Sequence, residues 1–113
     1  MSRIAIVGSR GYPNRRRVEA YVRALPEGTI VVSGGAQGVD TWAEQAARSR
    51  GLDVEVYHAD WKRYGKAAGP IRNAEVVKAA DSIIAFWDGG SRGTKSTMAL
   101  ARRADKPLTV YGP

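Results

Sequence analysis

Glycine recurs with serine and arginine in three short stretches of this 113-residue sequence. The stretches are GSRGYPN at 8–14, SGGAQGVD at 33–40 and DGGSRGT at 88–94. Glycine permits positive φ angles and a close approach to the backbone, so a glycine-rich turn that leads into a helix can present several N–H donors to one anion. The positive end of the helix dipole adds to this attraction. The chemistry that such loops favour is the binding of phosphate oxygens.

Arginine adds to this pattern in two of the stretches. Arg10 and Arg92 each stand inside a Ser-Arg-Gly triplet, and the planar guanidinium of arginine can hold two phosphate oxygens at once. A single glycine-rich stretch is often no more than a tight turn after a strand. Three of them at one place are a stronger signal. We therefore predict a phosphate-bearing ligand, provided that the fold brings the three stretches together.

The rest of the chain alternates between strand and helix patterns. Runs rich in β-branched residues predict five strands, at 3–8, 29–34, 53–58, 81–87 and 107–112. Apolar residues at helical spacing predict four helices, around 18–25, 39–47, 71–77 and 98–104. This alternation implies a parallel sheet with right-handed crossovers and helices on both faces. We predict one Rossmann-like three-layer α/β domain over residues 1–113, with a five-stranded parallel sheet in the order 3-2-1-4-5.

This topology determines where the glycine-rich stretches lie. In open parallel sheets the ligand binds beyond the carboxyl ends of the strands, where the strand order reverses. The loops after the first, second and fourth strands meet at that crevice, so we expect them to form one site. Neither the G-x-G-x-x-G spacing after the first strand nor a Walker lysine motif is present, which disfavours an NAD dehydrogenase and a P-loop nucleoside triphosphatase.

Local signals predict the structure next to the second and third strands. The residues TWAE at 41–44 have the spacing of a capping box for the second helix, and Asp40 is itself a residue type that caps helices. The stretch ADWKRYGKAAGP at 59–70 is predicted to be a loop that ends where the third helix begins.

Composition limits what else the protein can be. With 43% hydrophobic and 26% charged residues, the chain is typical of globular proteins. It has no cysteine and one histidine, His58, which excludes disulfides and thiolate chemistry and disfavours a metal site. We expect no cofactor. No apolar run approaches the roughly 20 residues of a membrane span and no signal region precedes the first strand, so we expect a cytoplasmic protein with no membrane partner. The formal charge of +7 favours anionic partners.

Four stretches of the sequence resemble one known family. They are VGSRGYPN, VVSGGAQGVDTWAEQAA, ADWKRYGKAAGPIRNAEVV and DSIIAFWDGGSRGTKSTMALA, which together reach over nearly the whole chain. In this order they resemble the SLOG superfamily, specifically its small stand-alone YspA-type (YpsA-related) branch. The superfamily takes its name from the DNA-processing protein Smf/DprA and from the Lonely Guy phosphoribohydrolases. The resemblance implies a Rossmannoid domain that binds nucleotides, nucleotide-derived signals or nucleic acid.

The resemblance also implies which residues contact the ligand. The stretch 33–40 resembles the S-G-x-A-x-G-x-D motif of DprA-type domains, and Arg72 matches an arginine ahead of the fourth strand in the Lonely Guy enzymes. Together with the loop residues chosen above, the candidate ligand-binding set is Gly8, Ser9, Arg10, Ser33, Gly34, Gly35, Gly38, Asp40, Trp61, Arg72, Asn73, Asp88, Gly89, Gly90, Ser91, Arg92, Gly93 and Thr94.

Catalysis is a separate question from binding. The stretch 89–94 resembles the P-G-G-x-G-T loop of the Lonely Guy enzymes, but it has one extra residue, and the glutamate that follows that loop in the enzymes falls here at Thr97. A hydroxyl cannot replace a carboxylate that stabilises a ribosyl cation or acts as general acid and base. Asp60, Glu75 and Asp88 are alternative carboxylates, although a solvated helix position explains Glu75 more simply and a turn explains Asp88 more simply. We expect binding without turnover, by a sensor, carrier or sequestering protein, with a phosphoribohydrolase-like N-glycosidase as the alternative.

Single-stranded DNA is a third possible ligand. Arg15, Arg16 and Arg17 begin the first helix and could neutralise DNA phosphates, although such a run is usually a solvated helix face. Aromatic side chains that could stack on a base, or instead cover the core, are Trp61, Tyr64 and Trp87. A nucleotide explains the glycine-rich loops better, and DNA explains the net charge better. A homodimer is also expected, from the behaviour of such small domains.

Overall fold

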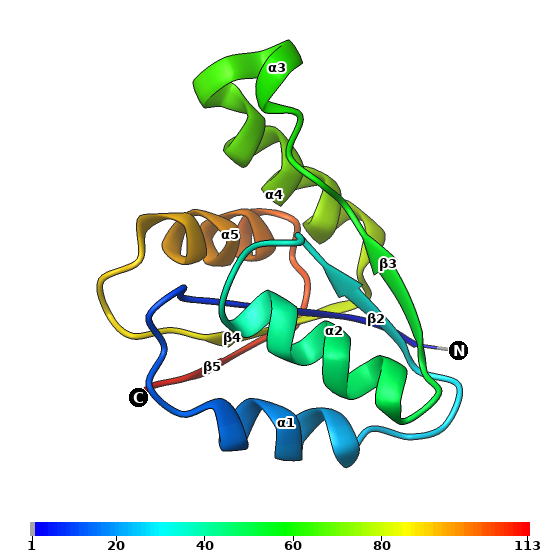
Figure 1. Ribbon diagram of the computed structural model, residues 1–113. Coiled ribbons are helices and arrows are strands. Elements are labelled where there is room, and N and C mark those ends of the chain that lie inside the picture. The colour runs from blue at the N-terminus through cyan, green and yellow to red at the C-terminus, as the bar shows by residue number, and fades with distance from the viewer. Residues whose placement is uncertain (1) are drawn as a thin grey trace.

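Five parallel strands form the centre of the molecule (Figure 1). The computed structural model describes residues 2–113. The strands pair in the order β3-β2-β1-β4-β5, every pair parallel. Their bounds are β1 Arg3–Gly8, β2 Ile30–Ser33, β3 Asp53–Val56, β4 Ser82–Phe86 and β5 Leu108–Tyr111. The predicted Rossmann-like fold and strand order are confirmed.

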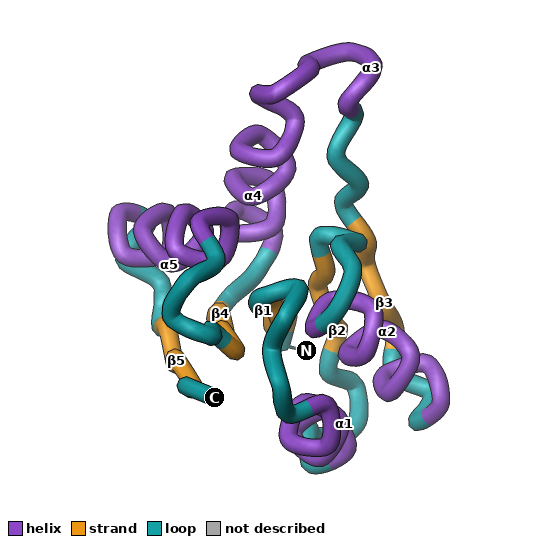
Figure 2. Tube along the Cα trace, turned by 60° about the vertical axis from the view of Figure 1, so that its left-hand side comes forward, coloured by secondary structure: helices purple, strands orange, loops and turns teal. Residues whose placement is uncertain are grey.

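Helices cover both faces of the sheet, as Figure 2 shows. α1 and α2 lie on one side, and α4 and α5 lie on the other. A single 3-10 turn, Gly65–Ala67, joins α3 to α4. The helix bounds are α1 Arg15–Arg23, α2 Val39–Ser49, α3 Trp61–Tyr64, α4 Ala68–Ala79 and α5 Arg92–Arg103.

The two faces of the sheet bury different sets of side chains. Successive residues of a strand point to opposite faces, so Ile6 packs with α1 and α2 while Ala5 and Val7 pack with α4 and α5. Both layers are apolar, which is why the strands are continuous hydrophobic runs rather than alternating ones. The aromatic ring of Phe86 is fully buried and stacks on Tyr111, at a centroid distance of 5.3 Å.

The segment 59–70 is not the loop that the sequence predicted. It contains α3, and α4 already begins at Ala68. Asp60 caps α3, because its Oδ1 atom accepts the N–H of Arg63 at 3.1 Å. Pro70 lies in the first turn of α4, where a missing N–H costs no helical hydrogen bond. As a result α3 and the start of α4 project from the body of the molecule (Figure 1).

The predicted capping box of α2 does not form. The N-cap is Gly38, which makes no side-chain hydrogen bond. Thr41 instead donates its hydroxyl to the carbonyl of Ala36 at 2.8 Å, and Glu44 accepts the hydroxyl of Ser33 at 2.6 Å. Both side chains therefore tie α2 to the end of β2 and to the loop between them.

Long-range side-chain contacts hold the C-terminal part of the chain. Tyr12 donates its phenol to the Gly112 carbonyl at 2.6 Å. The ammonium of Lys106 donates to three carbonyls at the end of α4, those of Val77, Lys78 and Ala80. The first loop and the last turn of α4 are thus both joined to the segment around β5.

Candidate functional site

The three glycine-rich loops meet at the carboxyl edge of the sheet. Asp88 donates its N–H to the hydroxyl of Ser9 at 3.0 Å, which joins the loop after β4 to the loop after β1. Gly38 has a φ of +81°, and a Cβ there would lie 2.6 Å from the carbonyl oxygen of Arg10. The loop after β2 therefore touches the loop after β1. What approaches Gly38 so closely is the protein's own backbone.

A cavity of about 170 Å³, here called the inner chamber, opens where these loops meet α4 and α5. An engineered protein cavity of about 150 Å³ holds one benzene molecule, so the inner chamber has room for a single phosphate or a sugar ring. Its walls are Val7, Gly8, Arg10, Gly34, Ala36, Gln37, Asp40, Arg72, Asn73, Val76, Ser91, Gly93, Thr94 and Thr97.

A second cavity of about 350 Å³, the outer chamber, lies beside the first on the side of α3. It is lined by Arg10, Gly34, Gly35, Ala36, Gln37, His58, Ala59, Trp61 and Arg72. The residues that line both chambers form a shared wall, namely Arg10, Gly34, Ala36, Gln37 and Arg72. Since small-molecule sites usually measure 300–1,000 Å³, the two chambers together have the size of such a site.

Arg72 is held in place at the shared wall. Its Nη1 atom donates to the carbonyl of Gly34 at 2.6 Å, and its Nε atom donates to Oδ1 of Asn73 at 2.9 Å. Asn73 in turn donates to the carbonyl of Gly93 at 3.4 Å, at the start of α5. The guanidinium is partly buried, so its position between the two chambers is fixed by α4 and by two of the loops.

Asp40 brings a buried carboxylate to the inner chamber. Its side chain is 5% exposed, and its Oδ2 atom accepts the N–H of Ala36 at 3.2 Å. Burial raises the pKa of Asp40 to about 7, although the N–H of Ala36 and the charge of Arg72 act to lower it. Among residues 2–113, Asp40 provides the one carboxylate that lines either chamber.

Many backbone N–H groups of the loops are engaged by side chains of the same loops. In the loop after β2, Gly35 donates its N–H to the hydroxyl of Ser33 at 3.2 Å and Ala36 donates to Asp40. These donors point at protein acceptors. The charged donors that line the chambers are instead the guanidinium groups of Arg10 and Arg72.

The loop after β4 is organised in the same way around Asp88. Its Oδ1 atom accepts the N–H groups of Gly90 and Ser91 at 2.8 and 3.0 Å. These two N–H groups, together with the hydroxyl of Ser9, lower the pKa of Asp88. The hydroxyl of Ser91 then accepts the N–H of Thr94 and caps α5. Asp88 therefore shapes this loop and does not line either chamber.

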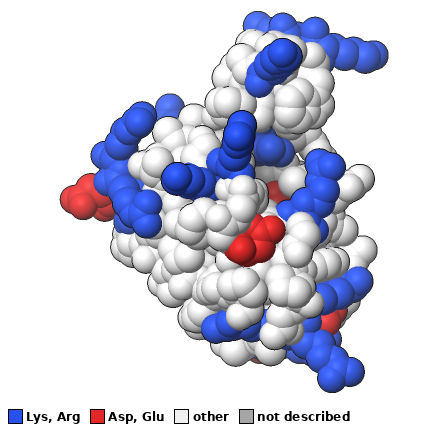
Figure 3. Space-filling view, turned by 90° about the vertical axis from the view of Figure 1, so that its left-hand side faces the viewer, with Lys and Arg blue, Asp and Glu red and all other residues white. Residues whose placement is uncertain are grey.

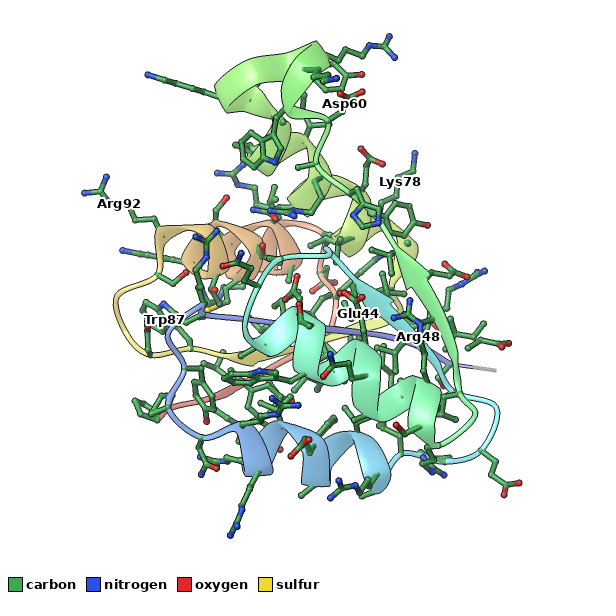
Figure 4. All side chains as sticks on the ribbon, in the orientation of Figure 1. Glu44, Arg48, Asp60, Lys78, Trp87 and Arg92 are labelled. Atoms are coloured by element: carbon green, nitrogen blue, oxygen red, sulfur yellow. The ribbon has the colours of Figure 1, made fainter. Side chains whose placement is uncertain are left out.

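The structure separates the candidate ligand-binding residues into two groups. Those that line a chamber are Gly8, Arg10, Gly34, Gly35, Asp40, Trp61, Arg72, Asn73, Ser91, Gly93 and Thr94. Those that line neither are Ser9, Ser33, Gly38, Asp88, Gly89, Gly90 and Arg92. Figure 4 shows the side chain of Arg92 directed away from the body of the molecule.

Several lining residues were not predicted, chiefly Gln37, His58 and Thr97. A signal for Thr97 was available, because it lies three residues after Thr94 on α5 and so shares a helix face with it. Its hydroxyl donates to the carbonyl of Gly93 at 3.1 Å. For Gln37 no sequence signal marked the side chain apart from its place in a glycine-rich loop.

The three candidate catalytic carboxylates lie outside both chambers. Asp60 caps α3 at the end of the projecting segment (Figure 4), Glu75 is exposed on α4, and Asp88 is engaged by its own loop. His58 lines the outer chamber. Within residues 2–113 no cluster of three or more histidine, aspartate or glutamate side chains is arranged to hold a metal ion.

Basic side chains are numerous on the face that carries the loops. Figure 3 shows many lysine and arginine side chains and few acidic ones on this face. In the run at the start of α1, however, two of the three arginines contact the protein itself. Arg15 lies over the ring of Trp42, and Arg17 donates to the Gly112 carbonyl and lies over the ring of Tyr111.

A family assignment agrees with this architecture. The sequence profile of the YAcAr family, described as the YspA, cpYpsA-related SLOG family, matches residues 2–64, which is more than half of the chain. The chain belongs to this SLOG family. The family resemblance inferred from the sequence is thereby confirmed.

Similar proteins extend the assignment of this SLOG domain. It is 41% identical to the gene 61 protein of Mycobacterium phage D29 over 122 residues, covering 99% of this chain and 98% of that protein. Among solved structures it resembles DNA processing protein A from Helicobacter pylori, reported with a unique single-stranded DNA binding mode, with a TM-score of 0.77 and 26% identity. It also resembles DNA processing protein A (DprA) from Streptococcus pneumoniae, with a TM-score of 0.84 and 22% identity.

The two DNA processing proteins are longer than this SLOG domain. The likeness covers 96% of this chain but 64% of the Helicobacter pylori protein, and 97% of this chain but 50% of the Streptococcus pneumoniae protein. No helix within residues 2–113 combines the length and the apolar character that crossing a bilayer requires.

Proposed function

We propose that this SLOG domain binds a nucleotide or a nucleotide-derived signal, with a phosphate in the inner chamber and the sugar and base in the outer one. The observation that carries the proposal is the shared wall, because it places the guanidinium groups of Arg10 and Arg72 at the boundary of a small chamber and a larger one. The inner chamber fits one phosphate, and both chambers together fit a nucleotide.

Each part of a nucleotide has a matching group in the two chambers. Hydrogen bonds between a phosphate and arginine are charge-assisted, and bonds of this kind contribute about 1.5–3 kcal/mol each. Gly93 lies in the first turn of α5, where the helix dipole contributes a further 0.3–1 kcal/mol or so. The ring of Trp61 is 59% exposed at the outer chamber, and stacking a base on such a ring is worth about 1–3 kcal/mol.

The proposal is binding without turnover, by a sensor, carrier or sequestering protein. A phosphoribohydrolase needs a carboxylate near the glycosidic bond, and the candidates Asp60, Glu75 and Asp88 line neither chamber. Thr97 stands where the Lonely Guy enzymes have glutamate. Incubation with nucleoside monophosphates followed by chromatography tests this point, because release of free base would favour the enzyme.

Single-stranded DNA is the second candidate ligand. Two observations favour it. One is the likeness to DNA processing protein A from Helicobacter pylori, reported for its single-stranded DNA binding mode. The other is the exposed segment 61–66, which comprises α3 and the start of the 3-10 turn that follows it. That segment carries two exposed aromatic rings among three basic residues, Trp61, Tyr64, Lys62, Arg63 and Lys66. Such a combination binds the bases and phosphates of single strands.

Calorimetry and thermal unfolding distinguish the two ligands. A nucleotide at 100 times its Kd should add about 2.7 kcal/mol to the free energy of unfolding. At the same ligand concentration Arg10→Ala and Arg72→Ala should each remove about half of this gain or more, while Arg102→Ala, far along α5, should keep it. A DNA-binding protein would instead retain single-stranded oligonucleotides with an affinity that falls steeply with salt. Replacing Lys62, Arg63 and Lys66 together by glutamine would then remove that retention.

Two further points belong to the proposal. A nucleotide-binding function fits a cytoplasmic location, which fractionation of cells that express the protein tests.

A homodimer is our expectation from the small size of the domain, and light scattering during size-exclusion chromatography measures the mass directly.

A further inference from the structure

The carboxylate of Asp40 lies in the chamber where the proposed function puts an anion. Its side chain belongs to the first turn of α2, and it lines the inner chamber together with Arg10 and Arg72. A carboxylate and a phosphate that share one small chamber repel each other while both carry their full charge. An anion-binding chamber with a buried carboxylate in its wall therefore needs an explanation.

The groups around Asp40 do not provide it with a dedicated cation. From α4, Arg72 makes its hydrogen bonds to Gly34 and Asn73, and its charge acts on Asp40 without a hydrogen bond between them. From α2 itself, Glu44 adds a second negative charge nearby.

The other elements around the chamber add little to balance this charge. The loop after β1 contributes Arg10, which is exposed at the rim. The loop after β2 contributes the N–H groups of Ala36 and Gly34. From α5 only the hydroxyl groups of Thr94 and Thr97 line the chamber. The cations that line the chamber are therefore left to serve the ligand as well as Asp40.

We infer that Asp40 carries a proton whenever a phosphate-bearing ligand occupies the inner chamber, so that the ligand binds together with one proton. This inference rests on the proposed function and adds a specificity-determining residue to it. A protonated carboxyl has an O–H that donates to a phosphoryl oxygen, whereas the ionised form can only accept and repels the anion. The proton comes from solvent and stays on the Asp40 carboxyl, and no covalent bond other than O–H forms or breaks.

The protonated form of Asp40 is accessible near neutral pH. Burial has already raised the pKa of this carboxyl to about 7 in the unliganded protein, and the charge of a bound phosphate raises it further. Below pH 7 the proton is already present, so binding requires no uptake. Above pH 7 the proton must be taken from solvent, so affinity falls as pH rises.

Isothermal titration calorimetry tests the inference. The probes are the four ribonucleoside 5′-monophosphates and inorganic phosphate, titrated between pH 7.5 and 9 in pairs of buffers with different ionisation enthalpies. The second pKa of a phosphate ester is about 6, so the phosphate group of the nucleotide probes does not titrate in this range. The wild-type protein should take up nearly one proton per ligand at the upper end, and its affinity should fall by up to about tenfold per pH unit.

Asp40→Asn is the matching variant, because asparagine keeps the shape and the acceptor for the Ala36 N–H but cannot ionise. It should bind with no proton uptake and with an affinity that stays constant from pH 7.5 to 9. Asp53→Asn, an exposed residue at the start of β3, should behave as wild type. If Asp40→Asn fails to fold, as judged by circular dichroism, Asp40→Ser takes its place.

The outcomes separate this inference from the function on which it rests. Binding by the wild type without proton uptake, or with the same pH dependence in Asp40→Asn, overturns the role of Asp40 and leaves nucleotide binding intact. If none of the probes binds at any pH to either protein, both proposals are wrong.

Discussion

The guanidinium of Arg72 donates a hydrogen bond of 2.6 Å to the carbonyl of Gly34, which lies 38 residues earlier in the chain. This bond joins α4 to the loop after β2 at the boundary between the two chambers. A Cβ on Gly34 would lie 2.8 Å from Cδ of Arg72. The glycine at this position therefore makes room for the arginine, and the arginine in turn fixes the loop.

Replacing Arg72 tests the role of this pair in binding. Arg72→Ala removes a charge-assisted donor worth about 1.5–3 kcal/mol, so nucleotide affinity should fall by about tenfold to 100-fold. Arg72→Lys should recover only part of the loss, because an ammonium cannot bond Gly34 and a phosphate in the same planar geometry. Calorimetry gives both values. An unchanged Kd in Arg72→Ala would contradict this role.

Gly38 and Gly51 have nearly the same φ angle, so comparing them shows how much free energy is lost when the contact between the loops is disturbed. Gly38 and Gly51 have φ angles of +81° and +80°, but only Gly38 has backbone atoms within reach of an added Cβ. Gly51→Ala should lose about 1–2 kcal/mol of unfolding free energy from the positive φ alone. Gly38→Ala should lose about 1–3 kcal/mol more, because its ψ of −125° lies outside the left-handed helical region and because the backbone at Arg10 has to move.

Urea denaturation of the two variants provides the comparison between Gly38 and Gly51. Equal losses of unfolding free energy would show that the two loops do not depend on close contact at this point.

The titration of Asp40 makes the stability of the unliganded protein depend on pH. The pKa of this carboxyl is about 7 in the folded protein and 3.8 as the ordinary value, so between these pH values the folded state holds a proton that the unfolded state releases. Its contribution to the unfolding free energy therefore falls as pH rises from about 4 to 7, by about 1.4 kcal/mol per unit at most, and is level above 7.

Asp40→Asn removes this dependence. The variant should match the wild type near pH 4 and exceed it by on the order of 4 kcal/mol at pH 8. Urea denaturation at the two pH values measures the difference, with Asp53→Asn as the control. A variant that is less stable than wild type at pH 8 would be contrary to the expected sign.

Lys106 offers a test of stability away from the chambers. Its ammonium donates to three carbonyls at the end of α4, which a helix otherwise leaves without partners. Lys106→Met keeps the aliphatic chain and removes these bonds, so we expect a loss of about 1–3 kcal/mol. Lys95→Met, an exposed position on α5, should change stability by less than about 0.5 kcal/mol. Thermal unfolding of both proteins provides the comparison.

The arrangement of the sheet was predictable because it follows from patterns that many residues share. The hydrophobic residues identify buried strands such as β1 and β4, and the preference for right-handed crossovers then leaves few possible strand orders. The prediction of a site at the carboxyl ends of the strands follows from the same topology. The family resemblance pointed to the same loops, and the chain's membership of the family is now established.

The local geometry of the loops was harder to predict because it depends on single side chains. Asp60 caps a helix of one turn, too short to have a hydrophobic period, so the segment around it was predicted to be a loop. Asp88 organises its loop by accepting two N–H groups. Which N–H groups it accepts depends on the conformation of the loop, and the sequence alone does not give that conformation. Glu44 bonds Ser33 rather than forming a capping box, because α2 begins at Val39 and Thr41 therefore lies inside the helix instead of at its N-cap.

The shared wall also has a thermodynamic consequence for fragments of a ligand. Since Arg10, Gly34, Ala36, Gln37 and Arg72 line both chambers, a molecule in one chamber restrains side chains that the other chamber uses. Phosphate alone and a nucleoside alone should then each alter the other's Kd by the same factor, as linkage requires. The intact nucleotide should bind with a more favourable free energy than the phosphate and the nucleoside together, because the residues of the shared wall need to be ordered only once.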